Sequence, residues 1–241
     1  VGGGLAGGKA VEGIREVDEE NSIAVITEEP RRPYQRPPLS KGYLVGEQPE
    51  EKVYVAEEAY YEASGVDVMT STRVTAVDPA AHTITLEDDR KLTYGKLLLA
   101  TGGTAKRLPI EGSDLSGVHT LRRVEDADAI RDATESGKHV LILGGSFIGS
   151  EVAAGASMLG ADVTMVFPEE RLLERIVPRE MSEYLHEVYG ARNVRILPGT
   201  VPERFMGGTH VDRVELSSGA TPNIDVAVMG VGITLNTELA R

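Results

Sequence analysis

The 241-residue sequence contains no cysteine, and this absence excludes several kinds of site at once. The chain has no disulfide framework, no thiolate zinc site, no ligands of its own for an iron–sulfur cluster and no redox-active dithiol. No stretch approaches the roughly 18 consecutive apolar residues of a membrane-spanning helix. The start of the chain also lacks the charged and apolar segments of a signal peptide. We therefore expect a cytoplasmic protein that neither enters a membrane nor is exported.

Basic residues are scarce relative to acidic ones. The chain holds 25 Lys and Arg against 38 Asp and Glu, a formal net charge of −13. A protein that binds nucleic acid needs a basic face that releases counterions, and attraction to anionic lipid needs positive charge as well. The charge balance argues against both partners. The five histidines show no ligand spacing, so the sequence predicts no metal site.

Apolar runs alternate with helical patterns, an order typical of parallel sheets covered by helices. Nearly unbroken apolar runs suit strands that are buried on both faces. The runs are Ile23–Ile26, Lys96–Ala100, His139–Leu143, Val163–Phe167, Val194–Leu197 and Val226–Met229. The helical patterns are Gly7–Val17, Phe147–Leu159 and Arg179–Val188.

Three shorter segments alternate between apolar and polar residues, as antiparallel strands do. They are Arg73–Val77, Thr83–Glu87 and Val211–Leu216, and a turn is expected at Asp88–Lys91. Leu108–Asp126 has the character of a linker between two repeating units. We therefore expect a boundary near residues 108–115.

The repeating unit is a strand, a glycine loop and a helix. Gly2, Gly4 and Gly7 fit the G-x-G-x-x-G spacing, in which the first glycine permits a tight turn and the third brings helix and strand together. The middle glycine lets the backbone approach a pyrophosphate, which sits at the helix N-terminus. An acidic residue is expected after the next strand to bind a ribose, and Glu28 follows Ile23–Ile26 as required.

The second loop is framed by strand His139–Leu143 and runs from Gly144 to Gly149. Ser146 replaces the middle glycine, so its hydroxyl either donates to a phosphate or weakens the site. Glu169 is the expected ribose ligand here, and its carboxylate would repel the 2′-phosphate of NADP. This favours NADH, although Arg171 lies nearby.

Three motifs carry a resemblance to a known family. They are Arg36-Pro37-Pro38-Leu39-Ser40-Lys41, Leu99-Ala100-Thr101-Gly102-Gly103, and the second glycine loop through Glu151. Together they resemble the flavin-dependent pyridine-nucleotide oxidoreductases, in the branch of the ferredoxin and rubredoxin reductases and the apoptosis-inducing factor. Val166-Phe167-Pro168-Glu169 is especially similar to the apoptosis-inducing factor, in which that glutamate contacts NAD. The resemblance covers essentially the whole chain.

The resemblance implies two Rossmann-like, three-layer α/β domains, with an FAD domain interrupted by an inserted NAD domain. The FAD domain would begin with residues 1–110, the NAD domain would span 111–232, and residues 233–241 would start the return to the FAD domain. No strand precedes the first loop, and the family's later Gly-Asp segment and final domain are absent. We therefore expect a chain truncated at both ends.

The family's cofactor contacts carry over residue by residue. The expected FAD contacts are Gly2, Gly4, Gly7, Glu28, Arg36, Lys41, Val74, Ala100, Thr101 and Gly102. The expected NAD contacts are Gly144, Gly145, Ser146, Phe147, Ile148, Gly149 and Glu169. Phe147 could gate the nicotinamide pocket or pack beneath the helix. Lys106 and Arg107 stand where the family has an arginine, so either could serve the phosphates, and Gly232 completes the set.

The implied activity is that of an NADH-dependent flavoprotein reductase, in which hydride passes from NADH to FAD. Lys41 is the expected catalytic residue near the flavin, and Glu151 is its partner, since burying the lysine without a carboxylate would be costly. Without a cysteine pair, the electrons must leave to an external acceptor, here a ferredoxin or rubredoxin. The alternatives are a monodehydroascorbate-type or quinone-type reductase, and an apoptosis-inducing-factor-like protein whose oligomeric state responds to NADH. The sequence leaves open whether the protein forms a homodimer.

Overall fold

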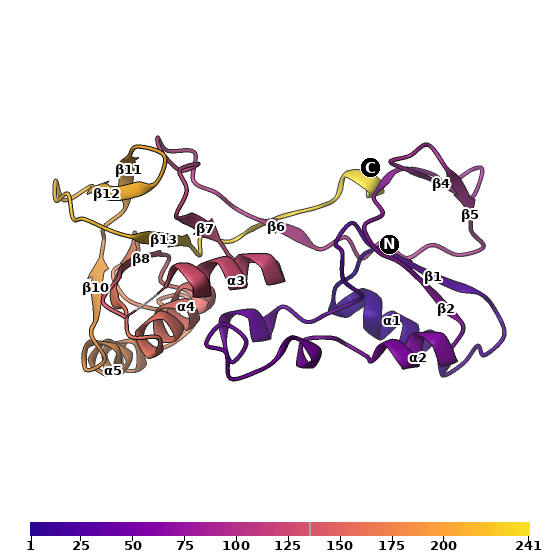
Figure 1. Cartoon of the computed structure of the whole chain (residues 1–241), viewed down its shortest axis with the longest axis horizontal. Helices are drawn as coiled ribbons and strands as arrows, with labels where there is room; N and C mark the ends of the chain where they lie inside the picture. The colour runs from indigo at the N-terminus through magenta and orange to yellow at the C-terminus, as the bar shows by residue number, and fades with distance from the viewer. Residues whose placement is uncertain (135) are drawn as a thin grey trace. The chain divides into compact units, whose positions relative to one another are not determined.

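A computed structural model describes residues 1–134 and 136–241, and the chain divides into two compact units (Figure 1). Unit 1 comprises Val1–Arg36, Pro49–Thr104 and Thr234–Arg241, and unit 2 comprises Pro37–Gln48 and Ala105–Ile233. Strands β6 (Gly103–Ala105) and β14 (Ile233–Leu235) lie where the chain passes between the units, and they form a two-stranded sheet.

Unit 1 contains two small sheets and two α-helices. Strands β1 (Ile23–Ile26) and β2 (Val66–Met69) pair in parallel, and β3 (Val74–Asp78), β4 (Thr83–Leu86) and β5 (Lys91–Thr93) form an antiparallel sheet. The helices are α1 (Leu5–Arg15) and α2 (Glu58–Ala63), with the short 3₁₀ helices η2 (Glu50–Lys52) and η3 (Glu238–Ala240).

Successive side chains of β1 point into different cores, because side chains along a strand alternate between its two faces. Val25 packs with Val11 of α1 and Tyr61 of α2. Its neighbour Ile26 packs with Ile84 and other residues of the antiparallel sheet. The parallel strands of unit 1 therefore lie between a helical layer and an antiparallel layer.

Unit 2 is built on a parallel five-stranded sheet in the order β10-β9-β8-β13-β7. Its strands are β7 (Val118–Thr120), β8 (His139–Leu143), β9 (Asp162–Phe167), β10 (Val194–Pro198) and β13 (Val226–Met229). Its helices are η1 (Pro37–Ser40), α3 (Val124–Ala133), α4 (Phe147–Met158) and α5 (Arg179–Gly190). A hairpin joins β11 (Pro202–Gly207) to β12 (Val211–Leu216).

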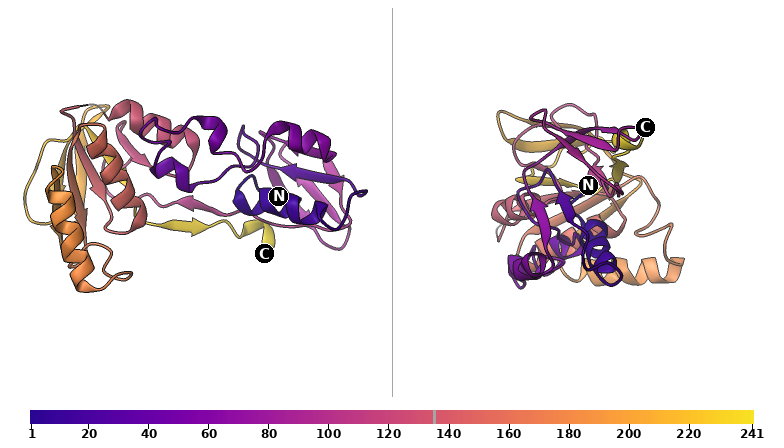
Figure 2. Two further views of the ribbon diagram at one scale, coloured as in Figure 1. Left: turned by 90° about the horizontal axis from the view of Figure 1, so that it is seen from below. Right: turned by 90° about the vertical axis from the view of Figure 1, so that its right-hand side faces the viewer.

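The strand order explains how this sheet is covered. The crossovers through α3, α4 and α5 all step the same way along the sheet, and right-handed crossovers that step the same way place their helices on one face. The connection from β10 to β13 steps back, so the β11–β12 hairpin lies over the opposite face (Figures 1 and 2). Unit 2 thus has three layers as well: helices, parallel sheet and hairpin.

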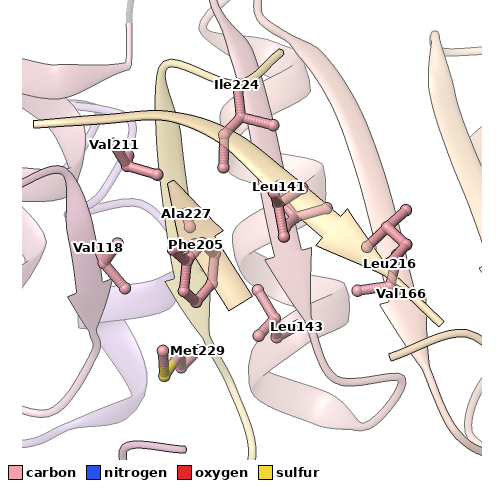
Figure 3. Close-up of a cluster of buried hydrophobic side chains, with 11 residues drawn as sticks. Val118, Leu141, Leu143, Val166, Phe205, Val211, Leu216, Ile224, Ala227 and Met229 are labelled. Carbon is pink, nitrogen blue, oxygen red and sulfur yellow. The ribbon is translucent and has the colours of Figure 1, made fainter. Parts of the chain in front are cut away.

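A cluster of buried apolar side chains fills the core between the sheet and the hairpin (Figure 3). Leu141 and Leu143 of β8 and Met229 of β13 share this cluster with Phe205 and Val214 of the hairpin, and all five are almost fully buried. Alternate residues of β8 face the helices instead, which is why its apolar run is unbroken.

Most predicted elements are confirmed, with helix limits that shift slightly. The helix expected at Gly7–Val17 spans Leu5–Arg15, because Gly4 is extended and ends the loop earlier than the glycines suggested. The turn after β4 is present, and Asp89 has a φ of +65° there. No helix in the described ranges 1–134 and 136–241 is long and apolar enough to cross a membrane.

Two predictions about elements are wrong. Lys96–Ala100 is not a regular strand: it lies beside Val1, and its backbone makes two hydrogen bonds with that residue, at Leu98 and Ala100, which is too few for a ladder. The segment Leu108–Asp126 is not simply a linker, because it contains β7, the edge strand of the unit 2 sheet, and the start of α3. A three-residue strand was too short to recognise from alternation.

Candidate functional site

The first glycine loop requires glycine at its two outer positions. Gly2 has a φ of +124°, and a Cβ there would lie 2.1 Å from the carbonyl oxygen of Ala100. A Cβ at Gly7 would lie 2.1 Å from the carbonyl oxygen of Gly2. Both contacts are with backbone, which cannot move aside. Gly4 is different, since a Cβ there would meet no protein atom within 4 Å.

The second loop repeats this geometry. Gly144 has a φ of +121°, and a Cβ there would lie 2.5 Å from the carbonyl oxygen of Gly230. A Cβ at Gly149 would lie 2.0 Å from the carbonyl oxygen of Gly144. Ser146 takes the place of Gly4, with φ −106° and ψ −167° against −94° and −174°. Its exposed side chain makes no capping hydrogen bond to α4.

The correspondence extends to the strand that follows each helix. A Cβ at Gly3 would strike Thr27 after β1, and a Cβ at Gly145 would strike Phe167 at the end of β9. The carbonyl oxygens of these two residues each accept a hydrogen bond from a threonine N–H, at Thr72 and Thr200 respectively. Thr27 and Phe167 are therefore structurally equivalent.

The same comparison identifies the counterpart of Glu169. The Ser71 N–H donates to the carbonyl oxygen of Glu29, and the Gly199 N–H donates to that of Glu169. Both donors have left-handed backbones, with φ of +47° and +63°. Glu169 therefore corresponds to Glu29 and not to Glu28, which the sequence spacing had suggested as its analogue.

Glu29 is engaged within the protein, whereas Glu28 is exposed. The Tyr34 hydroxyl donates to Glu29 Oε2 at 2.5 Å, and Arg36 Nη2 donates to Oε1 at 2.5 Å. Burial, the largest single effect, would lower the pKa of the Arg36 guanidinium, but its hydrogen bonds and charge interactions with Glu29 and Tyr34 together outweigh burial and raise that pKa. Glu28 is thus the exposed carboxylate after β1, and Glu29 is the buried one.

The remaining unit 1 residues of the expected site lie near the first loop or in the neighbouring core. The Ala100 N–H donates to the carbonyl oxygen of Val1, immediately before Gly2. Thr101 and Asn236 exchange hydrogen bonds, since Thr101 Oγ1 donates to the Asn236 carbonyl at 2.5 Å and Asn236 Nδ2 donates back at 3.1 Å. Val74 of β3 buries its side chain in the core that contains Ile26 and Ile84, so only its backbone is available to a ligand.

Lys106 and Arg107 differ in what they contact. The Lys106 N–H donates to the carbonyl oxygen of Gly232, which fixes the backbone while the side chain is exposed. The Arg107 guanidinium donates to the backbone carbonyls of Ser113 and Val118. Lys106 is therefore better placed than Arg107 to serve a phosphate.

Unit 2 brings Lys41 and Glu151 together. Lys41 Nζ lies 2.8 Å from Glu151 Oε1, and the Ser40 hydroxyl donates to Glu151 Oε2 at 2.5 Å. Helix η1 supplies Ser40 and positions Lys41, and the second turn of α4 supplies Glu151. The Lys41 side chain is 52 % exposed, so the ion pair contributes little net stability. The arrangement instead fixes the Lys41 ammonium near the N-terminus of α4.

Two further side chains border this pair and its loop. The Tyr189 hydroxyl donates to the carbonyl oxygen of Ser150 at 2.9 Å, and burial, with a smaller effect from Glu151, raises the pKa of Tyr189. Phe147 is 56 % exposed, which excludes packing beneath the helix. Ile148 is also exposed, so both first residues of α4 offer apolar surface beside the loop.

Glu169, the carboxylate that follows β9, forms an ion pair with an arginine. Glu169 Oε1 lies 3.5 Å from Arg175 Nη2, and the Arg175 side chain is largely exposed. Arg171 instead pairs with Glu174 at 3.2 Å and donates to its carbonyl oxygen. Arg171 is therefore held away from Glu169.

The roles of Ser40, Glu29 and Tyr34 escaped the sequence analysis. Ser40 stands inside the Arg-Pro-Pro-Leu-Ser-Lys motif, so the motif was a signal that could have directed attention to it. Glu29 was hidden by its neighbour Glu28, because spacing from a strand end cannot separate adjacent carboxylates. Tyr34 gave no signal beyond its position two residues before Arg36.

Both loops fit a dinucleotide. Each places unpaired N–H groups at the start of a helix, where the helix dipole favours an anion. The space beside Gly4 has no protein occupant, so a pyrophosphate can approach the backbone there. An exposed carboxylate follows β1, and a half-buried one follows β9, as ribose hydroxyls require.

Comparison with known proteins agrees with this geometry. The family described as pyridine nucleotide-disulphide oxidoreductase matches residues 1–241. The chain is 35 % identical, over its whole length, to the anthranilate 1,2-dioxygenase system ferredoxin–NAD(+) reductase component of Burkholderia cepacia, and covers 59 % of that protein. It is 33 % identical to a rubredoxin–NAD(+) reductase of Pseudomonas putida, of which it covers 63 %.

A solved structure matches as well. A chain of the covalent putidaredoxin reductase–putidaredoxin complex superimposes with a TM-score of 0.95 at 32 % identity, over 99 % of this chain and 59 % of that one. The chain thus spans about three-fifths of the length of these relatives. It belongs to the pyridine nucleotide-disulphide oxidoreductase family.

Proposed function

We propose that this protein is an NADH-dependent flavoprotein reductase that passes electrons from NADH through FAD to a ferredoxin or rubredoxin. The observation that carries the proposal is the repeated glycine loop, whose backbone geometry suits a dinucleotide twice in one chain. The Lys41–Glu151 ion pair, beside the second loop, supports it. The names of the relatives support the choice of acceptor.

FAD would bind to unit 1 and NADH to unit 2. Gly2, Gly4 and Gly7 would hold the FAD pyrophosphate, and Glu28 would hold its adenosine ribose. The loop of Gly144 to Gly149 would hold the NADH pyrophosphate, and Glu169 its ribose. The boundaries expected from the sequence, at residues 110 and 232, stay predictions, as do the cytoplasmic location and the homodimer.

The residues of this chain would orient charges and rings. A bound flavin would accept hydride from the nicotinamide and release electrons to a protein acceptor, so the protein need only position the two rings and stabilise charge. The Lys41 ammonium would stabilise the negative charge that accumulates during reduction. Glu151 would hold that ammonium in place, and Ser40 would fix the carboxylate through its second oxygen.

The proposal is tested by electron transfer in the full-length protein. NADH should bleach the visible flavin absorbance under anaerobic conditions, and an oxidised ferredoxin or rubredoxin should restore it. An artificial dye acceptor serves as the control for flavin reduction. If the dye is reduced but no ferredoxin or rubredoxin is, the choice of acceptor is wrong. If no flavin is bound, the proposal fails altogether.

A monodehydroascorbate-type reductase is the second candidate. The chain is 34 % identical to the monodehydroascorbate reductase, chloroplastic/mitochondrial, of Arabidopsis thaliana, of which it covers 50 %. Such an enzyme would accept the same hydride and reduce a small organic molecule. Steady-state rates with ferredoxin, rubredoxin and monodehydroascorbate separate the candidates, and the acceptor with the highest kcat/KM decides between them.

A further inference from the structure

Glu29 and Tyr34, both buried in unit 1, contact the half-buried side chain of Arg36. Glu29 accepts from both terminal nitrogens of the guanidinium, from Nη2 at 2.5 Å and from Nη1 at 3.2 Å. The Arg36 guanidinium also lies over the Tyr34 ring, 4.2 Å from its centroid. Tyr34 is fully buried, and the Glu29 side chain is only 10 % exposed. A bidentate pair in such surroundings fixes the plane of the guanidinium.

This group is connected to the first glycine loop. The Tyr34 N–H donates to the carbonyl oxygen of Gly3 at 3.2 Å. Gly3 in turn contacts Thr27, whose Oγ1 accepts from the Glu29 N–H at 3.3 Å. The backbone of the loop and the Glu29–Tyr34–Arg36 group are therefore held by the same short set of contacts.

The two halves of the protein use equivalent carboxylates in different ways. Glu169 of unit 2 is half-buried and pairs with the exposed Arg175, so part of its side chain is accessible to a ligand. Its equivalent, Glu29, is buried and turned toward Arg36. The position that could bind a ribose through Glu169 in unit 2 is thus occupied in unit 1 by Glu29, which pairs with Arg36.

We propose that Glu29 and Tyr34 are positioning residues that orient Arg36 toward FAD. The inference rests on the proposed function, because it requires FAD at the first loop. Glu29 fixes the guanidinium and neutralises its charge, and Tyr34 ties both side chains to the loop through its backbone. Arg36 then meets the cofactor in one preset orientation, which saves the entropy of ordering a long side chain on binding.

FAD titration into the apoprotein of the full-length protein, followed by quenching of flavin fluorescence, measures the effect. Glu29→Gln keeps the shape of the side chain but removes its charge, and should raise the Kd for FAD about tenfold. Tyr34→Phe should raise it about threefold. Glu19→Gln, at an exposed carboxylate of the same unit, is the matched control and should leave the Kd unchanged.

A double-mutant cycle with Arg36→Ala distinguishes positioning from a general structural role. If Glu29 acts through Arg36, adding Glu29→Gln to Arg36→Ala should raise the Kd no further. The inference would be overturned if the increases in Kd caused by Glu29→Gln and Arg36→Ala multiplied in the double variant. It would also be overturned if Glu29→Gln left the Kd for FAD unchanged and only made the apoprotein less stable. If Glu29→Gln does not fold, Tyr34→Phe takes its place in the cycle, and the same comparison of Kd values applies. Failure of the parent protein to bind FAD would instead refute the proposed function.

Discussion

The two glycine loops have the same backbone but differ at their middle residue. The outer glycines, at Gly2 and Gly7 and again at Gly144 and Gly149, are required because backbone approaches backbone. The middle glycine, Gly4, meets no such constraint, and Ser146 occupies the same conformation with a side chain. The outer positions therefore belong to the fold, and the middle position is available for adaptation to a ligand.

The largest effect is expected at an outer glycine. Gly149→Ala would press a methyl group onto the carbonyl oxygen of Gly144 and should destabilise the protein by about 3 kcal/mol or more. Chemical denaturation measures the free energy of unfolding. Gly190→Ala, at the end of α5, is the control, since a Cβ there meets nothing within 4 Å. Equal stability of the two variants would show that the outer glycines are not required.

The charge two residues after the last glycine also differs between the loops, with Lys9 in the first and Glu151 in the second. Lys9 pairs with Glu12 on the surface, whereas Glu151 pairs with Lys41. Lys41→Met should slow reduction of the flavin by NADH about a hundredfold, because it removes the cation that we propose stabilises accumulating charge. Stopped-flow absorbance measures this rate. Lys9→Met is the matched control and should react at the parent rate.

Exchanging the middle residues tests whether that position serves the ligand. Gly4→Ser would place a side chain in the space proposed for the FAD pyrophosphate and should weaken FAD binding about tenfold. Ser146→Gly should change NADH affinity less than threefold, since the serine side chain bonds nothing within the helix cap. Calorimetric titration gives both affinities. A Gly4→Ser protein that binds FAD normally would contradict this view of the position.

A smaller effect than that of Gly4→Ser is expected at Glu169, the carboxylate after β9. Glu169→Ala should reduce the preference for NADH over NADPH about fivefold, because a partly exposed charge contributes about 1 kcal/mol. It would also release Arg175 toward a 2′-phosphate. Combining Glu169→Ala with Arg175→Ala should therefore restore part of the preference. Ratios of kcat/KM for the two nucleotides measure it, and an unchanged ratio in Glu169→Ala would remove this residue from the site.

The sequence predicted strands and helices correctly, with one exception, where a hydrophobic pattern extended over at least four residues. Five of the six apolar runs are strands, and all three helical patterns are helices. Lys96–Ala100 failed because a strand also needs a partner, and apolar composition alone cannot report how many hydrogen bonds that partner makes. The short strand β7 was missed because three residues are too few to show a pattern. It is a strand because it pairs with β13, and that pairing cannot be read from its own sequence.

The candidate site was predictable to the level of motifs and no further. Lys41 and Glu151 were expected as partners, and the structure brings them within 2.8 Å. The second contact of that carboxylate, from Ser40, depends on how η1 and α4 meet, which no local pattern encodes. The different environments of Glu28 and Glu29 likewise depend on which side chain turns inward.

The position of β13 has a consequence for biosynthesis. β13 is the last strand of its sheet in the chain, but it lies between β8 and β7. Until residues 226–230 leave the ribosome, the sheet has a gap between β8 and its edge strand β7, and Gly144 lacks the Gly230 carbonyl against which it rests. The second loop can therefore take its final form only late in translation, after every helix that covers the sheet has been made. A nascent chain that stalls before this point would expose an unpaired strand edge, and such edges invite aggregation.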